Sequence, residues 1–107
     1  MSASVFVAFF GIRYEITISE SEDENDPRVR AARKNGLQFY SGNFGGQAER
    51  YLLFIGSRLG ILGAENRSEI VIAGRELQRV MESTREKLRT AGFEIEPALY
   101  LQWEEDV

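Results

Sequence analysis

The sequence contains no cysteine and no histidine, and these two absences restrict its chemistry more than any motif does. Without cysteine there can be no disulfide, no thiol nucleophile and no thiolate metal site. Without histidine the chain lacks the commonest general base and the commonest zinc ligand. We therefore expect no catalytic residue of these types, no metal site and no cofactor, and the sequence favours a protein that is not an enzyme.

Long apolar runs are also absent, and none reaches the roughly 18 residues that a membrane-spanning helix requires. The apolar N-terminal stretch has neither the cationic leader nor the small-residue cleavage site of a signal peptide. We therefore expect a cytoplasmic protein with no membrane partner. With 107 residues of ordinary globular composition, residues 1–107 are predicted to form a single domain.

Negative charge is concentrated in two segments. Residues 19–27 contain five acidic side chains and no basic one, and residues 104–107 contain three more. The first segment is predicted to be a mobile, solvated loop and the second an acidic tail. The rest of the chain has more basic than acidic residues, so the net charge of −4 does not exclude an anionic partner.

Several segments have the patterns of strands. Ser4–Ile18 begins as a continuous apolar run and then alternates, which is typical of a strand buried first on both faces and then on one. Further strands are predicted at Leu37–Phe44, Tyr51–Ile55 and Leu59–Leu62, the last two joined by a tight turn at residues 56–58.

Two segments are predicted to be helical. Asp26 and Pro27 are suited to the N-cap and first position of a short helix near 27–35. Apolar residues at helical spacing predict a long helix at about 74–91. Residues 69–72 are predicted to be a strand, with the first turn of the long helix as the alternative.

The last predicted strand is Phe93–Trp103. Because Pro97 cannot donate a hydrogen bond to a neighbouring strand, this is either an edge strand or one that begins at Ala98. Altogether the chain is predicted to have an α+β fold with a five- to six-stranded, mostly antiparallel sheet. The long helix packs on one face of that sheet, and the short helix completes the fold.

Two groups of residues are candidates for binding. Trp103, the only tryptophan, is suited either to the core or to a partner interface, and its position on the face of Leu99 and Leu101 favours the core. Tyr100 in the same strand is a second candidate. The other group is a basic patch on the short helix, formed by Arg28, Arg30, Arg33 and Lys34.

The function that these features favour is a small binding or regulatory module that acts through protein–protein contacts. Its partner is either another protein or a second copy, in a homodimer formed through a sheet edge. One alternative is nucleic-acid or phosphate-ligand binding through Arg28–Lys34. Another is a small enzyme using carboxylate and tyrosine chemistry in a pocket beside the sheet, lined by Arg13, Tyr14, Glu15, Tyr40 and Tyr51.

Overall fold

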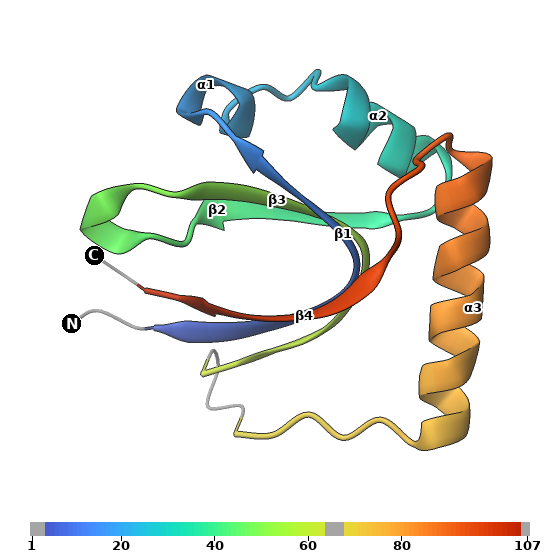
Figure 1. Ribbon diagram of the computed structural model, residues 1–107. Helices are drawn as coiled ribbons and strands as arrows, with labels where there is room; N and C mark the ends of the chain where they lie inside the picture. Colours follow the sequence, from blue (N-terminus) through green and yellow to red (C-terminus); the bar gives the residue numbers. More distant parts are fainter. Residues whose placement is uncertain (1–3, 64–67, 106–107) are drawn as a thin grey trace.

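The computed structural model of the protein describes residues 4–63 and 68–105, so Asp106 and Val107 of the predicted tail lie outside the described residues. The fold is α+β, with one four-stranded antiparallel sheet in the order β2-β3-β1-β4 (Figure 1). The strands are β1 (Val5–Ile16), β2 (Gln38–Asn43), β3 (Tyr51–Leu62) and β4 (Ala98–Glu104). The helices are α1 (Ile18–Ser21), α2 (Pro27–Lys34), the 3-10 turn η1 (Gly46–Ala48) and α3 (Gly74–Thr90).

The two long strands, β1 and β3, run through the middle of the sheet and pair along almost their entire lengths. Gly11 pairs with Gly56 near their midpoints, and a Cβ atom on Gly11 would lie 2.1 Å from the carbonyl oxygen of Ile55. Glycine at these positions lets the two backbones approach closely. The sheet is strongly curved, and all three α-helices lie on its outer side (Figure 1).

The curved sheet has two halves that share β1 and β3. In one, which we call the β4 half, β4 pairs with Val5–Gly11 of β1. In the other, the β2 half, β2 pairs with Tyr51–Gly56 of β3. Because β2 and β4 each have one neighbour in the sheet, they are its two edge strands.

The concave face is filled by apolar side chains from the sheet itself and from the β2–β3 loop. The rings of Phe9 and Phe54 lie 5.5 Å apart, and Phe44 contacts Phe54 at the same distance in an edge-on arrangement. Val7 and Leu52 complete this cluster and are fully buried. Residues 7–10 of β1 are buried on both faces, as their apolar run predicts, whereas Val5 and Phe6 at the start of the strand are only partly buried.

The convex face of the β2 half is covered by helices. Side chains of β1 and β3 pack here against α2, against the segment that follows it and against the C-terminal part of α3. The buried members of this second cluster are Ile12, Val29, Ala32, Leu37, Leu53, Ile55 and Leu88.

The helix predictions are confirmed. The side chain of Asp26 accepts a hydrogen bond of 2.8 Å from the amide of Arg28, so Asp26 is the N-cap of α2 and Pro27 is its first residue. Gly36, with φ of 71°, follows the C-cap and leads into the next strand. The long helix begins at Gly74, and Gly92 follows its end with φ of 90°.

The predicted number of strands is wrong. Residues 56–58 do not form a turn, because Gly56 and Ser57 pair with β1 and the ladder continues as the single strand β3. Residues 69–72 form no strand and precede α3 without regular structure. Their β-branched side chains have the intrinsic preference for a strand, but they pair with no neighbouring strand.

The first predicted strand ends at Ile16 and not at Ile18, and a helical turn, α1, begins at Ile18 and extends into the acidic segment that was predicted to be a loop. The hydroxyl of Thr17 accepts from the amide of Glu20 at 3.1 Å, and the Glu20 carboxylate accepts from the amide of Thr17 at 2.8 Å. This reciprocal pair is a capping box. The mobility of residues 19–27 stays a prediction. Within residues 4–63 and 68–105, no helix combines the length and apolar character needed to cross a membrane.

Candidate functional site

β4 begins at Ala98, immediately after Pro97, and among residues 4–63 and 68–105 its only neighbour in the sheet is β1. Side chains of successive residues in a strand point to opposite faces, so β4 presents two different surfaces. Leu99, Leu101 and Trp103 point to the convex face. Tyr100, Gln102 and Glu104 point to the concave face, where their partners on β1 are Phe9, Val7 and Val5.

The convex side of β4 is an exposed apolar surface. The exposed fractions are 52% for Leu99, 60% for Leu101 and 52% for Trp103. The expectation that Trp103 lies in the core is therefore wrong. Its ring contacts Phe6 of β1 edge-on, with centroids 6.1 Å apart, which orients the indole without burying it. We call these three residues, together with the free outer edge of β4, the β4 surface.

The β4 surface is bare because of where α3 lies. The two buried residues of this helix, Thr84 and Leu88, both belong to its C-terminal half. Leu77 and Met81 in the first half are only partly buried. Figure 1 shows α3 outside the bend of the sheet, near the point where β4 begins, while β4 runs away from the helix. No described helix therefore covers the convex side of β4 along its length.

The concave side of β4 is fixed by contacts within the fold. The ring of Tyr100 packs edge-on against Phe54 with centroids 5.6 Å apart, and the guanidinium carbon of Arg13 lies 4.8 Å from the Tyr100 centroid. Arg13 also donates a hydrogen bond of 3.0 Å to the side-chain oxygen of Gln102. Tyr100 therefore supports β4 from inside and does not share a surface with Trp103.

The two edge strands are joined by one side-chain hydrogen bond. The hydroxyl of Tyr40 on β2 donates to the carboxylate of Glu104 on β4 at 2.5 Å. Burial and this hydrogen bond both raise the pKa of Tyr40 above its ordinary value. Gly42 lies beside the same carboxylate, and a Cβ atom there would be 2.5 Å from its second oxygen. The end of β4 is therefore positioned by β2.

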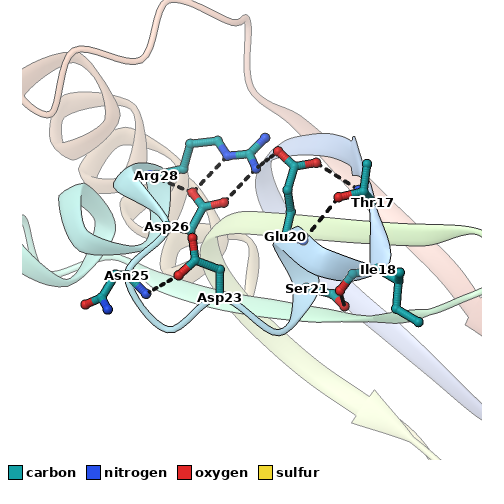
Figure 2. A network of polar contacts seen from close by, with 8 residues as sticks. All are labelled: Thr17, Ile18, Glu20, Ser21, Asp23, Asn25, Asp26 and Arg28. Atoms are coloured by element: carbon teal, nitrogen blue, oxygen red, sulfur yellow. Dashed lines mark hydrogen bonds and ion pairs between the residues drawn. The ribbon is translucent and has the colours of Figure 1, made fainter.

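The basic patch on α2 is only partly available for a ligand. Arg28 donates to both carboxylate oxygens of Asp26, at 3.0 and 2.7 Å, and to Glu20 at 3.0 Å (Figure 2). Its guanidinium also lies 4.9 Å from the ring centroid of Tyr14. Hydrogen bonds from Arg28 hold the pKa of the buried Asp26 below its usual value. Arg28 thus joins the acidic segment to α2 and to the sheet.

The other three basic residues of the patch are exposed. Arg30, Arg33 and Lys34 border a shallow depression on the outer side of α2, and the guanidinium of Arg33 lies 5.0 Å from the ring centroid of Phe39. The structure therefore separates the predicted patch into one internally paired arginine and three exposed cations.

The predicted enzyme pocket is not formed. Arg13 and Tyr40 point to the concave face, whereas Tyr14 points to the convex face beneath Arg28. Glu15 forms an ion pair with Arg50 at 3.0 Å and is exposed. The candidate residues are thus distributed over two faces of the sheet. In the part of the chain that the structure describes, no group of three possible metal ligands lies together.

A cleft of about 380 Å³ separates the C-terminal part of α3 from residues 92–97. Arg85, Arg89, Glu94 and Glu96 contribute charges of both signs to its lining. Arg89 is already paired with Glu86 at 2.7 Å, and Arg85 lies 5.7 Å from the ring centroid of Phe10. This mixed lining presents no concentrated charge to a ligand.

Leu99 and Leu101 were not among the candidates chosen from the sequence. The signal that could have identified them is the alternation of residues 98–104 directly after a proline, which places three large apolar side chains on one face of an edge strand. The chain matches no family model, and neither the curated proteins nor the solved structures include a significant match.

Proposed function

We propose that the protein is a small cytoplasmic binding or regulatory module that takes up an extended segment of a protein partner along the outer edge of β4. The observation that carries this proposal is the coincidence of a free strand edge with three apolar side chains that are each more than half exposed, Leu99, Leu101 and Trp103. Backbone groups on such an edge supply affinity, and alternate side chains supply specificity.

The composition of the β4 surface supports this proposal. Tryptophan is enriched among the residues that dominate binding energy at protein interfaces. The contacts of Arg13 with Tyr100 and Gln102, and of Tyr40 with Glu104, hold the strand from its other side. A strand that is already ordered loses little conformational entropy when a partner pairs with it.

The test is site-specific photocrosslinking in an extract of cells that produce the protein. A photoreactive phenylalanine replaces Trp103, and a matched variant carries the same group in place of Val71, which is apolar and 81% exposed but lies outside the sheet. We expect a protein adduct from position 103 and not from position 71. Adding Leu101→Lys to the first variant should remove the adduct, because the lysine places a charge in the middle of the apolar row. Equal labelling at both positions, or an adduct that persists with Leu101→Lys, would contradict the proposal.

A second proposal concerns the exposed cations of α2. Arg30, Arg33 and Lys34 lie on one short helix, and their exposure favours an anionic ligand such as nucleic acid or a phosphate group. The affinity for single- and double-stranded oligonucleotides should then fall steeply with salt and should decrease in Arg30→Glu. The matched variant Arg75→Glu reverses an exposed charge on α3 and should bind normally. An affinity that is insensitive to salt would remove this proposal.

A further inference from the structure

We propose that the segment taken up by β4 is β4 of a second copy of this chain, paired antiparallel about a two-fold axis that passes through Leu101. This inference rests on the proposed function and names its partner. The two four-stranded sheets would join edge to edge into one continuous sheet. The proposal is carried by the geometry of the strand, by the side chains that the symmetry brings together and by the features that this edge lacks.

The length of β4 determines the register in which two copies of the strand can pair. In a two-fold antiparallel pair, one residue lies opposite its own copy, and the remaining pairs are symmetric about it. Only an axis at Leu101, the middle residue of β4, pairs the whole strand from Ala98 to Glu104. Pro97 has no amide hydrogen to donate and therefore marks where the pairing ends.

In this register, apolar side chains of the two copies face each other across the strand pair. Leu99 lies opposite Trp103 of the second copy, and Leu101 lies opposite Leu101. The six side chains form one apolar row along the convex face, where each of them is more than half exposed in the single chain. Aromatic and branched residues that face each other across an antiparallel pair stabilise it.

The polar and charged residues of β4 are also compatible with this register. Tyr100 lies opposite Gln102 of the second copy, and Glu104 lies opposite the small, neutral Ala98. Like charges directly opposite each other would destabilise the pair, and this register contains none. In the single chain the Glu104 carboxylate accepts the hydrogen bond of the Tyr40 hydroxyl on the concave side of the sheet.

β4 lacks most of the features that usually prevent edge-to-edge pairing, and Glu104 at its last position is its one charged residue. Free edges of natural sheets are commonly blocked by charged side chains, especially lysine, by proline, by a bulge or by a covering segment. Residues 98–104 contain no lysine and no proline, and the β1–β4 register continues without a shift. The irregularity in this sheet lies between β1 and β3, next to Ala8 and Phe9.

The absence of cysteine from the natural chain makes the axis directly testable. Leu101→Cys places one thiol on each copy, and facing Cβ atoms of a strand pair lie close enough for a disulfide to form. We expect mild oxidation to link two Leu101→Cys chains covalently. Leu99→Cys alone should not be linked, but a mixture of Leu99→Cys and Trp103→Cys chains should be. Val71→Cys is the control for random collisions between exposed thiols.

The mass of the purified full-length protein, measured by sedimentation over a range of concentrations, gives the second readout. The natural chain should form a dimer. Leu101→Lys should weaken dimerisation at least about tenfold, because the two lysines face each other across the axis. Val71→Lys makes the same chemical change at another exposed apolar residue and should dimerise normally. Circular dichroism should show that both variants fold.

The outcomes separate this inference from the proposed function. A natural chain that is monomeric at every concentration and gives no Leu101→Cys link overturns the second copy as the partner. If position 103 still crosslinks to a different protein, and Leu101→Lys removes that adduct, the proposed function stands with a different occupant. If neither crosslink forms, both proposals are wrong. A dimer that resists Leu101→Lys and links equally through Val71→Cys forms elsewhere and contradicts the register.

Discussion

The two edge strands of the sheet differ in how their convex faces are covered. On β2, the ring of Phe39 packs against the helix-covered core and has the guanidinium of Arg33 5.0 Å from its centroid. On β4, the corresponding face carries Leu99, Leu101 and Trp103, each more than half exposed. One edge is thus closed on its apolar side by the chain itself, and the other is open.

The difference follows from the connections between strands. Between β1 and β2, the chain forms α1 and α2 and returns directly over the β2 half. Between β3 and β4, it forms the much longer α3, which packs chiefly against β1 and β3 through its C-terminal half. Because α3 packs at the bend of the two central strands, where the hydroxyls of Thr84 and Ser57 lie 2.6 Å apart, it does not extend along β4. The exposure of β4 therefore results from the position of α3 and not from a lack of apolar residues.

The free energy of unfolding should fall most when an apolar side chain is shortened on the convex face that the helices cover, and little on the convex face of β4. Leu53 is 2% exposed beneath the helices, and Leu53→Ala should lower the free energy of unfolding by about 2–5 kcal/mol. Leu101→Ala makes the same change at an exposed position and should cost about 0.5 kcal/mol. Urea unfolding followed by circular dichroism at low protein concentration, where association is minimal, measures both values. Similar losses for the two variants would mean that β4 is covered in solution.

A smaller loss of stability is expected at Asp26, the N-cap of α2, because this helix covers the convex face of the β2 half. Asp26→Ala removes the N-cap of α2 and one partner of Arg28, and should cost about 1–2 kcal/mol. Asp26→Asn keeps a good N-cap but loses the charge, so it should cost less.

The same carboxylate gives a pH dependence. The pKa of Asp26 is lower in the folded chain than its ordinary value of 3.8. The ionised carboxylate therefore makes its full contribution to the free energy of unfolding above pH 3.8, and this contribution is lost as the pH falls through the folded-state pKa. The stability difference between the natural chain and Asp26→Asn should therefore shrink in acid. Unfolding curves recorded from neutral pH into the acid range measure this; a constant difference would show that the carboxylate titrates normally in the folded chain.

An effect smaller than that of Asp26→Ala is expected at the hydrogen bond that joins the two edge strands. Tyr40→Phe removes the donor to Glu104 and should cost about 1 kcal/mol. The pKa of Tyr40 is raised in the folded chain above its ordinary value of 10.0. The protonated hydroxyl therefore makes its full contribution to the free energy of unfolding below pH 10.0, and this contribution is lost as the pH rises above that value. The difference between Tyr40→Phe and the natural chain should therefore decrease in alkali. Tyr51→Phe is the matched control, since Tyr51 lies on the opposite face of the sheet from Tyr40 and Glu104, and loss of its hydroxyl should leave their hydrogen bond unchanged.

Most of the local structure could be predicted from the sequence because its signals are local. Asp26, Pro27 and Gly36 place both ends of α2, and the apolar stripe places α3. The strand count could not be predicted in the same way. Whether residues 56–58 turn or continue depends on their pairing with β1, about 45 residues earlier, and no local pattern contains that information.

The candidate site was predictable only in part. Pro97 left two alternatives for the last strand, an edge position or a start at Ala98, and the structure shows a strand that both begins at Ala98 and lies at the edge of the sheet. The exposure of Trp103 does not follow, because three apolar residues on one face of a strand are equally suited to a core. Only the position of α3 decides between these alternatives. The separation of Tyr100 from Trp103 could have been predicted from the alternation of the strand alone.

The pairing of β4 with β1 also affects how the chain folds during synthesis. These strands are neighbours in the sheet, yet the residues that contact each other, such as Arg13 and Gln102, are separated by 89 positions in the sequence. At ribosomal rates of about 5–20 residues per second, β4 is therefore synthesised roughly 5–20 seconds after β1. During that time the apolar first half of β1 has an open edge. A nascent chain with such an edge is a natural client for chaperones, and long-range pairing of this kind slows folding.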